Sequence, residues 1–183
     1  RQSDMQTKRS TLILTLLGVL LLFPAAGSAQ DLMEGFKLHL DTSSDDFVYY
    51  NLSENREVTT QEAAFGSWDV AFQGTTVKFN GPSQLLAAAY DAVEEAPAEG
   101  FATSEDGTSE LPTDAETRWF NYDFNTHIIS AKPDRTAIFQ TKNGHWGKLN
   151  ITDYYKTVFG QDPIPRMLSF RWSVQKDGST SLK

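Results

Sequence analysis

The sequence predicts an all-β fold, a mainly antiparallel β-sandwich or barrel-like domain with one short helix and a long acidic loop. Short segments rich in aromatic and β-branched residues follow one another, about eight or nine of them, and turn-forming residues separate them. Neither a sustained helical period nor an internal repeat interrupts this pattern. Hydrophobic residues make up 39% of the 183 residues and aromatic residues 12%, which is enough for a single buried core.

The first thirty residues are typical of an export signal. Lys8 and Arg9 precede an apolar stretch at residues 11–23, and a run of small residues follows at 24–29. The apolar stretch is shorter than the roughly 20 residues that a membrane-spanning helix needs. We therefore expect a signal peptide at residues 1–29, rather than an uncleaved anchor, and one β-rich domain without a membrane span at residues 30–183.

Charge and cysteine content narrow the classes of function. The net charge is −8 and the predicted signal is itself basic, so the exported part is strongly acidic. An acidic chain does not suit the phosphate backbone, and we expect no nucleic-acid partner. The chain has no cysteine, which excludes disulfides, thiolate metal sites and a lipid-modified cysteine. We expect a free protein, periplasmic or secreted.

Each expected strand concentrates or alternates large apolar residues and ends at turn residues. Residues 47–52 are aromatic and β-branched, and we expect them to form a hairpin with residues 57–60. The pair Asn143 and Gly144 predicts a two-residue type I′ turn between the strands that flank it. The expected strands are residues 47–52, 57–60, 68–73, 75–80, 117–123, 127–131, 135–141, 146–152 and 167–174.

Two further segments have distinct compositions. Residues 83–95 are the one Ala-rich run and predict the short helix, with Ser83 as its N-cap. Residues 97–116 are acidic and rich in Ser, Thr, Gly and Pro, with few large apolar residues. We expect a long loop there, and its composition favours disorder over a functional loop.

The three histidines are the residues of this sequence best suited to bind a metal or to transfer a proton. His127 lies at the start of a predicted strand, where Asp123 can reach it across a turn, and a histidine with a carboxylate partner serves as a ligand or a base. The alternative is a half-buried histidine bonded to the backbone of the turn. His145 lies beside a hairpin turn and an aromatic residue, where it clamps a flat ligand or is simply exposed. His39 alternates with leucines on a first strand, and we expect it to be a surface residue.

Sequence motifs of enzymes and of divalent-metal sites are absent. The chain has no HxH, HExxH or EF-hand spacing and no GxSxG nucleophile motif. We therefore expect a binding protein without catalytic activity, and an exported hydrolase with an unrecognised site is the less favoured reading.

Adjacent aromatic residues indicate where ligands could bind. In the pairs Tyr49 and Tyr50, and Tyr154 and Tyr155, one ring must lie on each side of a strand. Six other aromatic residues fit core positions, so the outward rings either shield the edge of a sandwich or line a pocket for a flat apolar ligand. The expected core aromatics are Trp68, Phe72, Phe79, Trp119, Phe139 and Trp172.

Several of these segments, in this order, resemble the HmuY-like proteins, a family of exported β-rich haem binders. The most specific part is the strand, turn and strand over residues 141–155, and the strand that begins with Trp68 and Asp69 is next. The resemblance covers most of the chain from residue 47 to residue 174. The segments that carry it are residues 47–52, 68–72, 77–81, 92–101, 119–123 and 141–155.

The resemblance implies a single exported β-rich domain that holds haem between loops at one end, through two axial side chains. The histidine ligands of the family fall in the regions that match residues 101–118 and residues 122–123, where this sequence has no histidine. His127, His145 and Met167 are the candidate haem ligands in their place, with His127 and His145 as the candidate metal ligands.

The same resemblance bears on partners. It implies haem, or another flat apolar ligand, and an outer-membrane receptor or other surface protein. Haem carries anionic propionates, which basic residues would have to meet. The alternative is an interaction module that keeps the fold without the haem site. Basic residues near the expected site are Arg118, Lys132 and Arg135.

Overall fold

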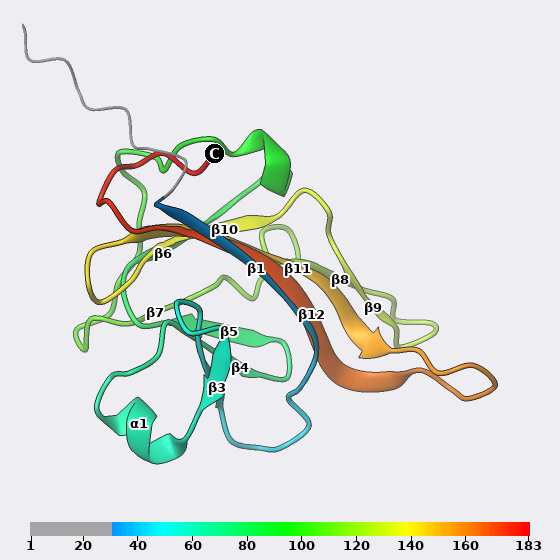
Figure 1. Cartoon of the computed structure of the whole chain (residues 1–183). Helices are drawn as coiled ribbons and strands as arrows, with labels where there is room; N and C mark the ends of the chain where they lie inside the picture. The colour runs from blue at the N-terminus through cyan, green and yellow to red at the C-terminus, as the bar shows by residue number, and fades with distance from the viewer. Residues whose placement is uncertain (1–30) are drawn as a thin grey trace, which may run out of the picture.

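Two five-stranded antiparallel sheets pack face to face in the protein, which the computed structural model describes over residues 31–183 (Figure 1). Sheet A has the strand order β1-β12-β11-β10-β6, and sheet B has the order β3-β2-β4-β5-β7. Strands β8 and β9 form a separate two-stranded hairpin. The prediction of a mainly antiparallel sandwich is confirmed. The predicted signal peptide at residues 1–29 lies outside the described residues.

The elements are short, apart from three strands of sheet A. In sheet A the strands are β1 (Leu32–Asp41), β12 (Ile164–Gln175), β11 (Trp146–Lys156), β10 (Thr136–Gln140) and β6 (Ser83–Leu86). In sheet B they are β3 (Arg56–Val58), β2 (Val48–Asn51), β4 (Val70–Gln73), β5 (Thr76–Phe79) and β7 (Ser109–Glu110). The remaining elements are β8 (Phe120–Tyr122), β9 (Ile129–Ala131), the helix α1 (Thr60–Ala64) and the 3₁₀ turn η1 (Tyr90–Ala92).

Aromatic rings fill the space between the two sheets. Phe170 of sheet A packs against Tyr50 and Phe72 of sheet B, with ring centroids 5.5 and 4.9 Å apart. Phe79 stacks on Phe139 at 4.8 Å, and all five rings are buried. Such pairs add to the free energy gained by burying their area. The six aromatic residues expected in the core are all buried.

The outer face of sheet A is also buried, because chain segments lie across it. We name these residues 87–103 and 176–183 the covering segment. Val93 and Leu182 of this segment pack with Ile138 of β10. The Lys148 ammonium of β11 donates hydrogen bonds to the carbonyls of Val93 at 2.8 Å and Tyr90 at 3.2 Å. The covering segment is therefore tied to the sheet by apolar contact and by a buried charge.

This cover replaces the helix predicted at residues 83–95, and that prediction is wrong. Residues 83–86 form β6 at the edge of sheet A, and only η1 has helical geometry in the remainder. Burial of Val93 and Ala96 against the sheet outweighs the weak helix preference of the alanines.

The α-helix forms elsewhere, immediately after β3. Thr59 accepts a hydrogen bond from the Glu62 amide, and the Glu62 carboxylate accepts one from the Thr59 amide, which makes a capping box. Arg56 holds the pKa of Glu62 down, to about 2. The expectation that residues 57–60 form a strand is correct only as far as Val58. The spacing of Thr59 and Glu62 was the sequence signal for the helix.

The acidic loop is anchored rather than disordered. Its Phe101 ring lies 4.9 Å from the Trp146 ring, and Leu111 is buried. The hydroxyl of Ser109, also buried, lies 2.6 Å from the Gly81 carbonyl oxygen. The short strand β7 pairs with β5 in the middle of this loop. The composition predicted disorder because these anchors are few and widely spaced.

The turn between β10 and β11 has three residues instead of the two predicted. Thr141 pairs with His145 through a backbone hydrogen bond of 2.8 Å, and the Gly144 amide donates to the Thr141 carbonyl at 2.9 Å. Gly144 has φ +81°, whereas Asn143 does not have positive φ. A type I′ turn needs positive φ at both central residues, so the prediction of that type is wrong.

Gly35 of β1 lies so close to the Trp172 indole that a side chain does not fit there. A Cβ atom at this position would lie 2.2 Å from Trp172 Cζ2. Since Trp172 is buried in the core and cannot move away, we expect Gly35→Ala to lower the free energy of unfolding by about 1–3 kcal/mol. Chemical denaturation measures this change. Glu34→Ala, on the neighbouring exposed position, is the control, and an equal effect of both would contradict the steric explanation.

Tyr90 belongs to the covering segment and is buried against β11, and its ionisation should weaken the fold. Burial raises the pKa of its phenol to about 12. In the unfolded chain the phenol loses its proton at about pH 10, so from pH 10 to 12 the unfolded state binds fewer protons than the folded state. We expect the unfolding free energy to fall over that range in wild type, and to fall less in Tyr90→Phe. Denaturation at pH 9, 10 and 11 measures it; an identical slope in both proteins would contradict this assignment.

Candidate functional site

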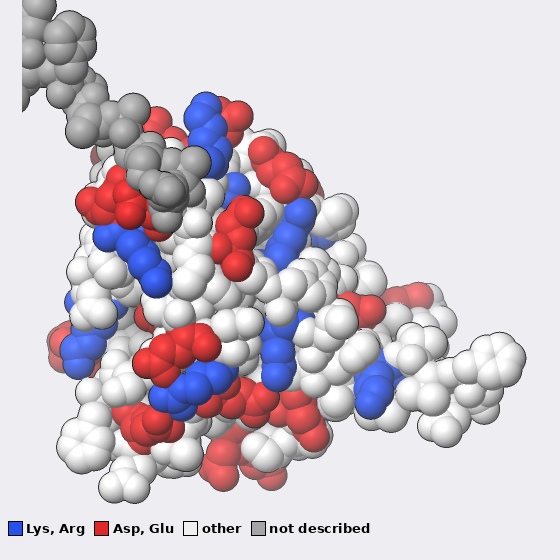
Figure 2. Space-filling view, viewed as in Figure 1, with Lys and Arg blue, Asp and Glu red and all other residues white. Residues whose placement is uncertain are grey.

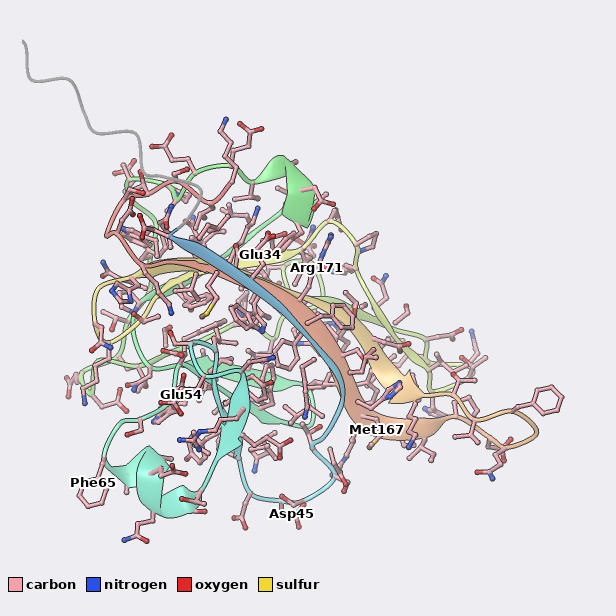
Figure 3. All side chains as sticks on the ribbon, viewed as in Figure 1. Glu34, Asp45, Glu54, Phe65, Met167 and Arg171 are labelled. Atoms are coloured by element: carbon pink, nitrogen blue, oxygen red, sulfur yellow. The ribbon has the colours of Figure 1, made fainter. Side chains whose placement is uncertain are left out.

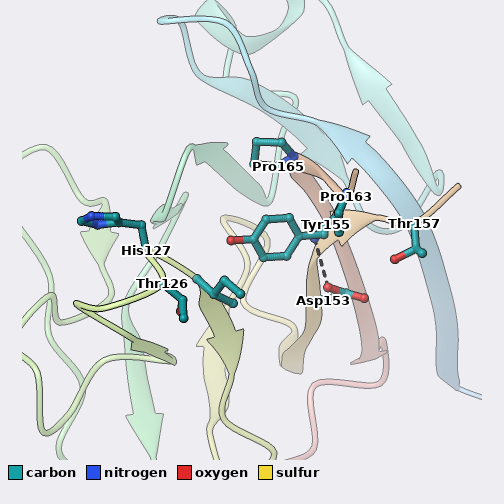
Figure 4. A pocket seen from close by; sticks show the side chains of 8 residues that line it. Thr126, His127, Asp153, Tyr155, Thr157, Pro163 and Pro165 are labelled. Atoms are coloured by element: carbon teal, nitrogen blue, oxygen red, sulfur yellow. Dashed lines mark hydrogen bonds between the residues drawn. The ribbon is translucent and has the colours of Figure 1, made fainter. Parts of the chain in front are cut away.

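A cleft opens between the β8–β9 hairpin and the distal part of strands β11 and β12. We name this part, together with the loop that joins the two strands, the arm (residues 152–168). The arm extends beyond the sandwich in Figure 1. The cleft has a volume of about 460 Å³. Its lining residues are Thr126, His127, Ile128, Asp153, Tyr155, Thr157, Pro163 and Pro165 (Figure 4).

The turn of the β8–β9 hairpin sets the position of His127. The Asp123 carboxylate accepts hydrogen bonds from the amides of Asn125 at 2.8 Å and Thr126 at 3.4 Å. The Asn125 amide in particular lowers the pKa of Asp123. The His127 amide donates to the Asp123 carbonyl at 2.8 Å, and His127 takes the left-handed conformation with φ 58°. Asp123 therefore shapes the turn through its side chain and its backbone.

The ring of His127 is held by a different partner from the one predicted. Its Nδ1 lies 2.6 Å from the Tyr122 hydroxyl, so the expected bond to Asp123 is wrong. The Asp123 carboxylate instead accepts hydrogen bonds from two backbone amides of the turn. His127 is exposed, at the margin of the cleft opposite Thr157 and Pro163 (Figure 4). Imidazole Nε2 has no hydrogen-bond partner within residues 31–183.

Tyr155 joins the hairpin to the arm. Its hydroxyl accepts a hydrogen bond from the Ile129 amide at 3.0 Å. The Asp153 carboxylate accepts from the Tyr155 amide at 3.0 Å and from the Tyr154 amide at 2.7 Å, where β11 bulges. Tyr154 is buried toward the core while Tyr155 faces the cleft, as the adjacent pair predicted. The bulge thus turns one ring of the pair into the wall of the cleft.

Apolar side chains are exposed around this cleft. Phe124 is 79% exposed and Ile128 52%, on the hairpin turn, whereas Phe159 at the end of the arm is fully exposed. Ile164 on the arm is 41% exposed. These four residues could not be recognised from the sequence, because an apolar residue in a turn carries no sign of its exposure. Ile128 lines the cleft, and the other three add exposed apolar area on the hairpin and the arm.

His145 and Met167 do not join His127. His145 precedes β11 and Tyr155 lies near its far end, so ten residues of extended chain put them on the order of 30 Å apart. The His145 amide donates to Thr141 Oγ1 at 3.1 Å in the hairpin turn. Met167 of β12 pairs with Asp41 of β1. It lies two residues beyond Pro165 and does not line the cleft (Figure 3).

Two of the three basic residues expected near the site fix a loop instead. Lys132 Nζ donates to the carbonyls of Ala115 and Glu116, and Arg135 donates to those of Glu116 and Thr117. Lys132 and Arg135 therefore hold the end of the acidic loop. Arg118 instead contacts β8: it lies 4.4 Å from the Phe120 ring and donates to the Phe120 carbonyl at 3.0 Å.

His39 has a structural position. It lies in a β-bulge of β1 with φ 52°, and its amide donates to Ser169 Oγ at 3.2 Å. It is half-buried rather than a fully exposed surface residue. Within residues 31–183, no group of three or more His, Asp or Glu side chains is arranged to hold a metal ion. The same residues contain no helix that is long and apolar enough to cross a membrane.

Comparison with known proteins gives one family and one fold. The family model described as HmuY protein matches residues 43–172. An apo HmuY analog from Tannerella forsythia aligns with a TM-score of 0.57 and 13% identity, over 79% of this chain and 96% of that chain. Apo PinO from Porphyromonas gingivitis aligns with a TM-score of 0.51 and 13% identity, over 79% of this chain and 97% of that chain. No curated protein matches in sequence.

Proposed function

Because the chain belongs to the HmuY protein family, we propose that it is an exported binding protein, without catalytic activity, that takes up haem beside the β8–β9 hairpin. Residues 1–29 direct export, and the domain from residue 30 acts in the periplasm or outside the cell. The family supplies the class of ligand. One observation carries the assignment of the residue, the 2.6 Å contact between the Tyr122 hydroxyl and His127 Nδ1.

An imidazole ligand binds iron through one nitrogen while a hydrogen bond holds the other. Tyr122 holds Nδ1 of His127, which leaves Nε2 for the iron. Phe124 and Ile128 lie on the same turn and offer exposed apolar area to a porphyrin. His127 is therefore the axial ligand in this proposal, and haem is the cargo.

The donor set in this part of the chain fits one axial side chain. His145 lies at the far end of β11, and Met167 does not line the cleft, so neither shares a haem with His127. Propionates need cations, and the arm carries two. Arg166 donates a hydrogen bond to the Ser43 carbonyl at 3.2 Å and lines a different pocket. Lys156, which follows Tyr155, is therefore the cation of the arm that we propose for a propionate.

A second function rests on the exposed apolar side chains around the cleft. An interaction module that keeps the fold without haem would dock a surface protein through Phe124 and Phe159, which are 79% and fully exposed. The two functions differ in a direct way, because only the first requires His127. A receptor protein in the outer membrane is a suitable partner for either.

A haemin titration of the purified exported protein separates these functions. We expect a saturable, shifted Soret band at micromolar haemin in wild type. His127→Ala should weaken binding by about tenfold or more, because the iron loses its axial nitrogen, and His145→Ala should leave it unchanged. Absorbance in the oxidised and reduced forms measures both. A featureless titration of wild type would overturn haem binding and leave the docking function.

Tyr122→Phe tests the partner of His127 without removing the ligand. We expect haemin affinity to fall by about tenfold, since the imidazole loses the bond that orients it. The ring remains in Tyr122→Phe, so its edge contact with Phe124 at 5.0 Å is kept. Tyr49→Phe, the same change away from the cleft of His127, serves as the control and should leave haemin affinity unchanged. Unchanged haemin affinity in Tyr122→Phe, alongside a loss in His127→Ala, would show that the hydroxyl has no part in positioning.

A further inference from the structure

A second cleft lies away from His127, between the start of α1 and the connection from β1 to β2. We name it the α1 cleft; it has a volume of about 290 Å³. Its walls combine two aromatic rings with two carboxylates, and none of its lining residues is basic. The lining residues are Asp45, Asp46, Phe47, Tyr49, Thr60 and Gln73.

We propose that the α1 cleft binds a small organic ammonium ion, against the rings of Phe47 and Tyr49 and beside the carboxylates of Asp45 and Asp46. An ammonium group is attracted to the face of an aromatic ring, and pairs of rings with nearby acids recognise such groups in many proteins. This site is independent of haem, which is an anionic ligand at neutral pH. The inference therefore goes beyond the proposed function.

The two rings are fixed in place by packing behind them. Tyr49 contacts the buried Trp68 edge to face, with centroids 5.1 Å apart. The Phe47 and Tyr49 centroids are 6.3 Å apart, with the planes tilted by 43°. Both rings are half-buried, so each keeps part of its surface for the cleft. Rigid rings bind a ligand with little loss of conformational entropy.

The carboxylates of Asp45 and Asp46 have no side-chain hydrogen bond or ion pair within residues 31–183. Arg166 lines a neighbouring pocket with Asp45, but its guanidinium donates to the Ser43 carbonyl. By contrast, Glu62 and Asp91 each pair with an arginine. Figure 3 labels Asp45 on the connection below sheet B, and Figure 2 shows acidic side chains gathered along that lower edge. A cation entering the α1 cleft is attracted by both charges.

The segment that bears these carboxylates is held against sheet B. The side-chain amide of Gln73, at the end of β4, donates a hydrogen bond to the Asp45 carbonyl oxygen. The Asp46 amide donates to Ser44 Oγ at 3.2 Å. The two acidic residues are therefore kept beside the two rings.

Choline and its neutral analogue 3,3-dimethylbutan-1-ol test the proposal on the purified exported protein. They have the same shape and differ in charge, so a site built for a cation binds choline and not the alcohol. NMR titration follows the backbone amides of Phe47 and Tyr49 and the Gln73 side-chain amide. We expect saturable shifts with choline, which weaken as salt screens the carboxylates, and none with the alcohol.

Two conservative variants locate the site. Asp46→Asn removes one charge, and Phe47→Leu removes a ring but keeps an apolar side chain; each should weaken choline binding by about fivefold. Asp162→Asn, on the arm, makes the same change of charge away from the α1 cleft and should have no effect. Thermal melting confirms that each variant is folded. A parallel titration with phosphatidylcholine vesicles shows whether the ammonium group comes from a lipid or from a free molecule.

Some outcomes would overturn the proposal. Equal shifts with choline and the alcohol would mean that the cleft selects shape alone. Shifts with calcium ions but not choline would assign the carboxylates to a metal. No shift with choline up to tens of millimolar, or equal weakening in Asp162→Asn, would remove the site. Loss of haemin binding in His127→Ala affects none of these readings, so the two proposals fail separately.

Discussion

Burial of β11 and β12 on both faces is the constraint on which the rest of the fold depends. Leu149 and Trp172 of these strands face sheet B, while Lys148 and Ser173 face the covering segment, and all four are at most 5% exposed. A polar face can be buried only where its groups find partners. The Lys148 ammonium finds two carbonyls of the covering segment and lies 4.4 Å from the Tyr90 ring. Burial lowers the pKa of this ammonium group, and the nearby charges of Asp91 and Glu34 act in the opposite direction. The covering segment thus follows from the polar alternation of β11.

The same constraint explains which parts of the fold the sequence predicted. Strands that bury large apolar residues in the common core, such as β4 with Phe72 and β10 with Phe139, are predicted by their own sequence pattern. The run at residues 83–95 does not, because its locally helical composition is overridden by a sheet face formed mainly by residues far along the chain. The prediction that the acidic loop is disordered failed for a related reason. Three separate contacts keep this loop in place, and its composition does not reveal them.

Of the three candidate ligands, only His127 lines the cleft, and its role as a ligand stays a prediction. His127 followed from its type and its place beside a strand, and the structure puts it on the margin of a cleft. Its partner could not be predicted, since the left-handed conformation of His127 directs the ring to Tyr122 and the turn amides take up Asp123. His145 lies at the other end of β11 from Tyr155, because this strand is 11 residues long. The exposure of Phe124 and Phe159 could not be predicted from the sequence either, since exposure depends on how the elements pack.

The net charge of the protein does not by itself determine which ions it binds. An overall charge of −8 argues against an anionic ligand only where the acidic side chains face it, and charges beyond a Debye length of about 10 Å are largely screened. Asp45 and Asp46 lie on the β1–β2 connection, and Arg166 faces this connection, because it lines a pocket with Asp45 and donates to the Ser43 carbonyl. Lys156 lies on the arm, next to Tyr155 of the cleft of His127. The two clefts share no lining residue, since one lies between the arm and the β8–β9 hairpin and the other between the β1–β2 connection and α1. One small acidic domain can thus present a surface suited to an anionic porphyrin and another suited to a cation.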